Sequence, residues 1–307
     1  DAHSLIRRAQ GAFLGLALGD ALGATTEFMT PAEVKARFGV HRRMVGGGWL
    51  RLKPGQVTDD TETSLALARA VLATGSWDLR AVAEAFAAWL RSRPVDMGAT
   101  CARGIRRYLH GGTLEAPPNE WDAGNGAAMR VVPVALFALG DDPLLTRYAL
   151  EQARLTHNHP LSDAACVTVA GMVQAAVRGE PLSALRARAD RLASLHPGFG
   201  FGDGPGACSP YVVDTLRVAF HSFFTTHTFE QCLVATVNLG GDADTAGAIA
   251  GAVAGAHYGL GALPRRWVRR LDREIHRQVL RAAEGLVRLS PGVRDGGDRT
   301  GLGQRLP

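Results

Sequence analysis

Two adjacent carboxylates between two threonines pose a choice between a helix cap and a metal site. The sequence TDDT places Asp59 and Asp60 after Thr58, directly before the apolar run of residues 61–74. Asp and Thr are favoured at helix N-termini, where they accept hydrogen bonds from free backbone N–H groups and where a carboxylate complements the helix dipole. A cap, however, needs only one carboxylate, and this segment supplies two.

A second acidic cluster has the same order of residue types. Asp242, Asp244 and Thr245 follow a pair of glycines, and the next residues, 246–256, have no charged side chain. We expect these residues to form a buried helix whose N-terminus is also partly buried. Buried carboxylates without partners are costly, and carboxylates near one another have raised pKa values unless cations compensate them.

Together the two clusters predict a site for two divalent cations, provided that the two helix starts meet. Four carboxylates match the charge of two such ions, and sites of this kind hold their ions roughly 3.5–4 Å apart. All the donors are hard oxygens, which favours Mn²⁺ or Mg²⁺, whereas Zn²⁺ usually takes His or Cys. The predicted metal ligands are Thr58, Asp59, Asp60, Asp242, Asp244 and Thr245.

The elements that would position these residues are helices, because helical spacing of apolar residues recurs and alternation typical of strands is absent. We therefore predict an all-α fold, with one catalytic domain over residues 1–290 and a disordered, Gly-rich tail over residues 291–307. The predicted helices span residues 5–23, 61–74, 78–92, 98–110, 126–139, 143–155, 161–178, 182–195, 210–224, 228–237, 243–258 and 264–288.

Charge and cysteine content limit the classes of partner and compartment. The net charge is +5, but the arginines are spread along the chain without a basic block, so we expect no nucleic-acid binding. The four cysteines have no metal or redox spacing and fit a reducing cytoplasm. The first ten residues show no signal-peptide pattern, and we expect no transmembrane segment.

The two acidic motifs also carry a resemblance to a known family. With GLALGDALGATTEFM, WLRSRPVDMGATCARGIRRY, DAGNGAAMR and THNHPLSDAAC, they follow the order of motifs in the ADP-ribosylglycohydrolases through most of residues 10–260. The resemblance implies a compact orthogonal helical bundle with a binuclear Mn²⁺ or Mg²⁺ cleft. It also implies hydrolysis of the N-glycosidic bond between ADP-ribose and an arginine side chain of a protein.

Further residues receive roles only through this resemblance. It implies that the six predicted ligands bind the metals and that Asp96 and Glu27 are catalytic. It implies that Gly124, Asn125, Gly126, His157 and Tyr211 bind substrate. At Ala99 the chain departs from the related subgroup, in which a polar Asn is common; this would remove one contact to ribose or water.

Each of these residues also has a simpler interpretation. Asp96 stands before residues 98–110 and is a good N-cap for that helix. The glycines around Asn125 can turn backbone N–H groups toward a diphosphate, or they can form an ordinary turn. Tyr211 can stack on adenine or simply pack against the protein. His157 is predicted to form a hydrogen bond in the cleft, and His159 to be structural.

The resemblance is strongest to the subgroup that acts on ADP-ribosylated dinitrogenase reductase, through RSRPVD and THNHPLSDA. It implies that protein as substrate, and a PII-type regulatory protein that recruits the enzyme reversibly to the membrane. Two alternatives remain open. One is a non-catalytic module that binds ADP-ribose, and the other is a Mg²⁺-dependent all-α prenyl-diphosphate enzyme, although the helices lack the aromatic lining that a carbocation pocket needs.

Overall fold

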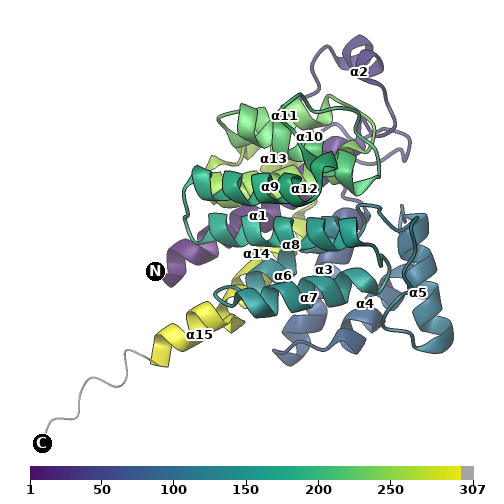
Figure 1. The fold of residues 1–307 in the computed structure, drawn as a ribbon. Helices are drawn as coiled ribbons and strands as arrows, with labels where there is room; N and C mark the ends of the chain where they lie inside the picture. Colours follow the sequence, from purple (N-terminus) through teal and green to yellow (C-terminus); the bar gives the residue numbers. More distant parts are fainter. Residues whose placement is uncertain (299–307) are drawn as a thin grey trace, which may run out of the picture.

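The computed structural model describes residues 1–298 of the chain, and these residues form helices joined by turns and loops (Figure 1). The prediction of an all-α fold is confirmed, with two isolated bridges and no strand in the described part of the chain. The α-helices are α1 (Ala2–Ala24), α2 (Pro31–Phe38), α3 (Asp59–Thr74), α4 (Leu79–Arg91), α5 (Ala99–Gly111), α6 (Val132–Phe137), α7 (Asp142–Arg154), α8 (Pro160–Val177), α9 (Leu182–Leu195), α10 (Val212–Thr225), α11 (Phe229–Val237), α12 (Ala243–Tyr258), α13 (Arg265–Arg270), α14 (Arg273–Leu289) and α15 (Pro291–Asp298). Three short 3-10 helices are η1 (Ala128–Arg130), η2 (Pro197–Phe199) and η3 (Leu260–Ala262).

Two glycine-rich helices, α1 and α12, form the centre of the fold. The glycines of α1 recur every four residues and face the glycines of α12 in antiparallel order, so the two backbones touch. A Cβ atom on Gly19 would lie 1.9 Å from the carbonyl oxygen of Gly247, and one on Gly15 would lie 2.2 Å from that of Gly251. This close antiparallel packing brings the C-terminal end of α1 beside the N-terminal end of α12, where the second acidic cluster lies.

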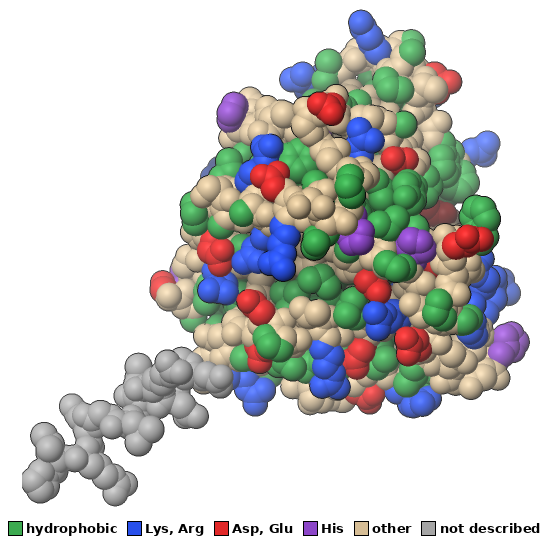
Figure 2. Space-filling view, viewed as in Figure 1, with side chains coloured by type: hydrophobic (Ala, Val, Ile, Leu, Met, Phe, Trp, Pro, Cys, Tyr) green, Lys and Arg blue, Asp and Glu red, His purple; other side chains and the backbone are tan. Residues whose placement is uncertain are grey.

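Most of the other helices surround this pair and contribute to one large hydrophobic core. Helices α8, α10 and α11 pack against α12, whereas α14 packs against α1 and α3. The core draws buried side chains from Ile6 near the N-terminus to Val287 near the end of α14. In Figure 1, α4 and α5 lie at one end of the molecule, and α2 stands away from the other helices. Over the face in Figure 2, Lys and Arg side chains are interspersed with Asp and Glu.

Several predicted boundaries were wrong for identifiable reasons. Helix α2 was missed because Val34 is its one buried residue, so it lacks apolar periodicity; its start is set by a capping box between Thr30 and Glu33. The predicted helix 264–288 is two helices, since the Asp272 side chain caps the start of α14. The predicted helix 126–139 is η1 followed by α6.

Part of the predicted disordered tail is helical. Residues 291–298 form α15, which begins with Pro291. The N–H of Gly292, at the start of α15, donates a hydrogen bond to the carbonyl of Leu139. The side chain of Val293 packs against the core. The rest of the predicted tail, residues 299–307, lies outside the described residues. Within those residues one helix, α8, has the length and apolar composition to cross a membrane, and 61% of its apolar window is buried in the fold, as in the core helix of a globular protein.

Candidate active site

The first acidic cluster is organised by Asp20, a residue of α1. The carboxylate of Asp20 is fully buried and accepts hydrogen bonds from the backbone N–H and the hydroxyl of both Thr58 and Thr61, at 2.6–3.1 Å. Thr58 therefore starts α3 without making a side-chain cap of its own. The simple cap interpretation of TDDT fails, because Asp20 satisfies the N-terminal backbone and leaves Asp59 and Asp60 free for another role.

The hydroxyl of Thr58 shows how crowded this site is with negative charge. Its oxygen lies 2.6 Å from Asp20, 3.0 Å from Asp60 and 3.3 Å from both Asp59 and Asp244. A hydroxyl has a single proton to donate. It can therefore donate to only one of these four carboxylates at a time.

The second cluster begins at a turn that only glycine permits. Gly240 and Gly241 have φ values of +65° and +57°, and a Cβ atom on either would lie within 2 Å of a backbone carbonyl oxygen. The turn directs Asp242 and Asp244 inward at the start of α12, where both are buried. Asp242 makes no cap hydrogen bond; its carboxylate instead accepts from the side-chain amide of Asn125 at 2.6 Å.

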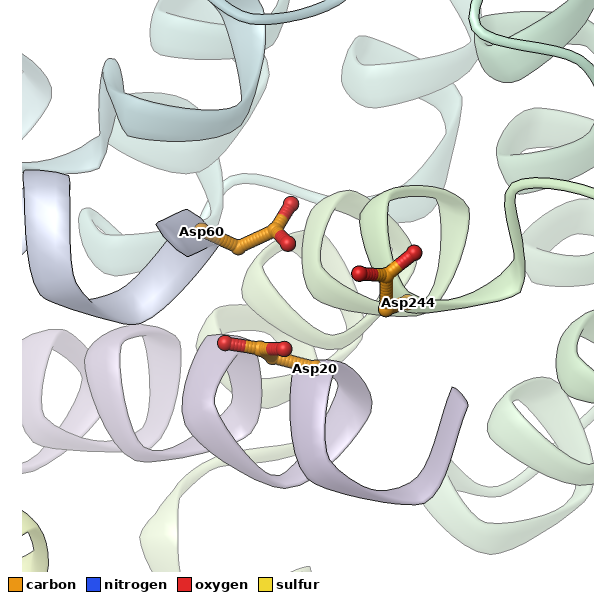
Figure 3. Close-up of side chains that lie close together, drawn as sticks. All are labelled: Asp20, Asp60 and Asp244. Carbon is orange, nitrogen blue, oxygen red and sulfur yellow. The ribbon is translucent and has the colours of Figure 1, made fainter. Parts of the chain in front are cut away.

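Seven carboxylates converge where the ends of α1, α3 and α12 meet. They form three overlapping groups, each with oxygens within 4.8 Å of one another, and Asp244 belongs to all three: Asp20, Asp60 and Asp244; Glu27, Asp242 and Asp244; Asp59, Asp96 and Asp244. Figure 3 shows the first group, with side chains from α1, α3 and α12 directed toward a common point. The two helix starts thus meet, as the predicted metal site requires.

No Lys or Arg among residues 1–298 forms an ion pair with these seven carboxylates. Burial, and then mutual repulsion, raises the pKa values of Asp59, Asp60 and Asp244 well above their usual range. Burial also raises the pKa of Asp20 to about 6, against the lowering effect of its four hydrogen bonds, and that of Glu27 to about 7.

The donor set fits divalent cations. One oxygen each of Glu27, Asp60 and Asp244 is buried without any hydrogen-bond partner. Such orphaned anionic oxygens are expensive unless a cation binds them. The acidic groups could therefore hold metal ions, and their all-oxygen chemistry suits hard cations.

A cavity of about 470 Å³ opens directly onto these carboxylates. Its wall includes Glu27, Asp59, Asp96, Asp242 and Asp244. Asp96 is half-buried in the loop before α5, and one of its oxygens accepts from the N–H of Met97 at 2.9 Å. Burial raises the pKa of this carboxyl, so its proton affinity moves toward the range useful for proton transfer.

Comparison with known proteins decides the family. The model of the ADP-ribosylglycohydrolase family matches residues 1–296. The chain is 55% identical to the ADP-ribosyl-[dinitrogen reductase] glycohydrolase of Rhodospirillum rubrum, over 92% of this chain and 96% of that protein. This chain is a member of the ADP-ribosylglycohydrolase family.

Other relatives extend the comparison. The chain is 32% identical to the ADP-ribosylarginine hydrolase Tri1 of Pseudomonas putida, over 89% of this chain and 76% of that protein. A solved structure described as an ADP-ribosylglycohydrolase-related protein complex superposes with a TM-score of 0.83 and 38% identity, over 94% of this chain and 99% of that one. The fold class expected from the resemblance is therefore confirmed, and a prenyl-diphosphate enzyme is excluded.

Four of the five predicted substrate-binding residues line the cavity. Gly124, Asn125, Gly126 and His157 line the cavity, and so does Ala99, whose small side chain leaves that part of the wall apolar. Tyr211 does not line it; the residue is 44% exposed and starts α10, beside the cavity-lining Pro210.

The backbone around Asn125 favours the ordinary turn over an anion-binding nest. The N–H of Asn125 donates to the carbonyl of Pro210, and neither flanking glycine has a positive φ. The space at Gly126 instead excludes a side chain. A Cβ atom there would lie 2.8 Å from the His157 ring and 2.6 Å from Cys101 Sγ. Asn125 orients Asp242, and its glycines make room for the imidazole.

The two histidines of the THNHP segment lie in different environments. His157 is 2% exposed at the cavity wall, and its Nδ1 is 2.7 Å from Thr156 Oγ1. His159 caps α8, where its ring accepts from the N–H of Leu161. Asp20, in contrast, was missed by sequence reasoning. The available signal was a lone carboxylate in the otherwise apolar segment GLALGDALG.

Proposed function

We propose that this chain is an ADP-ribosylarginine glycohydrolase, which removes ADP-ribose from an arginine side chain of a protein. The observation that carries the proposal is a cavity lined by five carboxylates of a seven-carboxylate cluster that forms no ion pair with Lys or Arg in the described residues. The activities for which the Rhodospirillum and Pseudomonas relatives are named support the bond that is cleaved and the arginine acceptor.

We propose that two divalent cations, Mn²⁺ or Mg²⁺, occupy this cluster. The six predicted ligands, Thr58, Asp59, Asp60, Asp242, Asp244 and Thr245, would hold them, and Asp244 belongs to all three carboxylate groups. When bound, such ions polarise hydroxyl and water oxygens as Lewis acids. Asp20 would act behind the ligands, since its lone pairs are engaged by Thr58 and Thr61.

The chain's own groups would then carry out the proton transfers. Asp96 faces the cavity with one oxygen free of the Met97 N–H, so it would accept the proton of the attacking water. Glu27, whose pKa is raised to about 7, would supply a second acid–base group. As the arginine leaves, the ribose acquires positive charge, which the anionic cluster stabilises.

The protein substrate would be ADP-ribosylated dinitrogenase reductase, which the 55% identity to the Rhodospirillum protein supports. Four free, buried cysteines support a reducing cytoplasmic location. Reversible recruitment to the membrane by a PII-type protein stays a prediction from the resemblance.

The test is release of ADP-ribose from an ADP-ribosylarginine protein. The enzyme is first treated with EDTA and then supplied with Mn²⁺ or Mg²⁺, and released ADP-ribose is quantified. We expect no release after chelation and recovery with either ion. Asp60→Asn should abolish recovery, whereas Asp190→Asn, a change at an exposed carboxylate on α9, should behave as the wild type.

Two results would contradict the proposal. Release that is unaffected by EDTA would remove the cations from the reaction. Absence of release with every ion, from protein that is folded and binds ADP-ribose, would make the chain a non-catalytic ADP-ribose-binding module.

A further inference from the structure

A buried arginine without a carboxylate partner lies behind the cavity wall. Arg130 is 0% exposed and forms no ion pair within the described residues. Its Nε donates to the side-chain oxygen of Gln152 at 2.7 Å, one terminal nitrogen donates to Thr156 Oγ1 at 2.8 Å, and the ring of Phe86 lies 4.6 Å from the guanidinium carbon. A guanidinium only donates hydrogen bonds, so Thr156 Oγ1 must accept in this contact.

The hydrogen bond that Arg130 makes to Thr156 is followed by a contact between Thr156 and His157. Thr156 Oγ1 is 2.7 Å from His157 Nδ1, and the proton between them can belong to either atom. If the hydroxyl donates, Nδ1 is an acceptor and the ring proton is on Nε2. If Nδ1 donates, the Thr156 proton turns to the sulfur of Cys101, a weak acceptor, and the Nε2 lone pair faces a cavity rich in carboxylates. Both consequences disfavour the second arrangement.

His157 Nε2 is open to the cavity. A Cβ atom on Gly124 would lie 3.2 Å from Nε2, and one on Gly126 would lie 3.1 Å from it, so the two glycines leave this edge of the ring uncovered. Nε2 has no protein hydrogen-bond partner within residues 1–298, whereas Nδ1 is engaged by Thr156. A group bound in the cavity can therefore reach Nε2.

We propose that Arg130, acting through Thr156, fixes His157 in the tautomer with its proton on Nε2, which makes His157 a permanent neutral hydrogen-bond donor to an oxygen of the bound ADP-ribosyl group. The identity of that ligand rests on the proposed function, but the tautomer does not. Arg130 and Thr156 are positioning residues in this scheme, and His157 is the residue that touches the substrate.

Neutrality matters because of what surrounds the ring. Burial first, and then the positive charges of Arg130 and Arg103, lower the pKa of His157 to about 3. A cationic imidazole would be attracted to carboxylates such as Asp96 and Asp242 across the cavity and would compete with metal ions for them. A neutral Nε2–H donor can instead bind a phosphate or hydroxyl oxygen of the substrate.

The tautomer can be measured directly by ¹⁵N NMR of histidine-labelled protein. The chain has ten histidines, and His157→Gln identifies the signals of interest by their loss. We expect a protonated Nε2 and an unprotonated Nδ1 that do not change between about pH 5.5 and 8, because the shifted pKa lies far below this range. A protonated Nδ1, or titration of the ring within the range, would overturn the proposal.

Matched variants at Thr156 test the role of the hydroxyl. Thr156→Val keeps the shape but removes the hydroxyl, and Thr156→Ser restores it. We expect Thr156→Val to give mixed tautomers and to raise KM for the ADP-ribosylated protein about tenfold, as loss of one hydrogen bond to a charged group does. Thr156→Ser should recover the wild-type spectrum and KM.

A Thr156→Val protein that keeps a single Nε2–H tautomer and the wild-type KM would also overturn the proposal. If the chain releases no ADP-ribose from any substrate but shows the expected tautomer in the wild type, the proposed function fails and the tautomer assignment stands. The tautomer is measured on the unmodified protein, and His157→Gln serves only to assign its signals.

Discussion

At the scale of single residues, Asp96 stands apart from the other acidic groups at the cavity. It is half-buried rather than enclosed, and it lies on a loop instead of a helix terminus. These features suit a group that exchanges protons with water more than one that is permanently bound to an ion.

Asp96→Asn should therefore separate turnover from metal binding. We expect kcat to fall at least ~100-fold, because an amide cannot accept the proton of the attacking water. Mn²⁺ affinity, measured by isothermal titration calorimetry, should stay within a few-fold of the wild type. A near-wild-type kcat would remove Asp96 from the chemistry, and a collapse of Mn²⁺ binding would make it a metal ligand.

Asp20 acts on the site through the two threonines. In the wild type, the hydroxyl of Thr58 donates to the Asp20 carboxylate at 2.6 Å. In Asp20→Asn the remaining carbonyl oxygen can still accept from Thr61, but the new amide N–H₂ faces the hydroxyl of Thr58. We expect Thr58 to turn and Mn²⁺ affinity to fall by ~10–100-fold, with the fold retained. Calorimetry against Asp190→Asn as control measures this. Unchanged affinity would reduce Asp20 to a structural carboxylate.

At the scale of the elements, the metal site depends on the glycine contact between α1 and α12. This contact fixes the distance between Asp20 near the end of α1 and Asp244 in the first turn of α12. Because both partners at the contact are backbone, neither can move aside as a flexible side chain would.

Gly19→Ala should consequently destabilise the protein strongly. The added methyl group would lie 1.9 Å from the Gly247 carbonyl oxygen. We expect a loss of about 3 kcal/mol or more, seen as a fall in Tm of several degrees in thermal denaturation. Gly261→Ala is the matched control, since a Cβ atom there meets nothing within 4 Å. Equal Tm values for the two variants would show that the helices can separate at little cost.

The elements also show what sequence could and could not predict. Apolar periodicity indicated the long helices, and the doubled Asp–Thr motifs indicated where the acidic ends lie. Periodicity says nothing about α2, whose start depends on a capping box and not on a buried face. Asp20 was missed because a single carboxylate in an apolar helix shows its role only when Thr58 and Thr61, some forty residues away, are placed against it.

At the scale of the whole molecule, the carboxylate cluster ties stability to pH and to metal ions. Burial raises the pKa of Asp20 to about 6 and that of Glu27 to about 7. In the metal-free protein these groups contribute stability that is fully present below their unfolded pKa values, near 4. That contribution is lost as pH rises through the folded values, because the folded state then holds ionised carboxyls out of water. His41 and His157, whose pKa values are lowered by burial, act in the opposite sense.

The difference in Tm between protein with and without Mn²⁺ cancels the contribution of the histidines, because that contribution is the same in both conditions. Protons and cations compete for the same oxygens, so the Mn²⁺-induced increase should grow as pH rises through about 6 to 7. Differential scanning fluorimetry at saturating Mn²⁺ should show an increase at pH 8 that exceeds the one at pH 5.5 by at least about 4 °C. Asp60→Asn should lose most of this pH dependence. If the wild type instead shows the same increase at both pH values, the cations bind somewhere other than these carboxyls, and the site built from α1, α3 and α12 is not the metal centre.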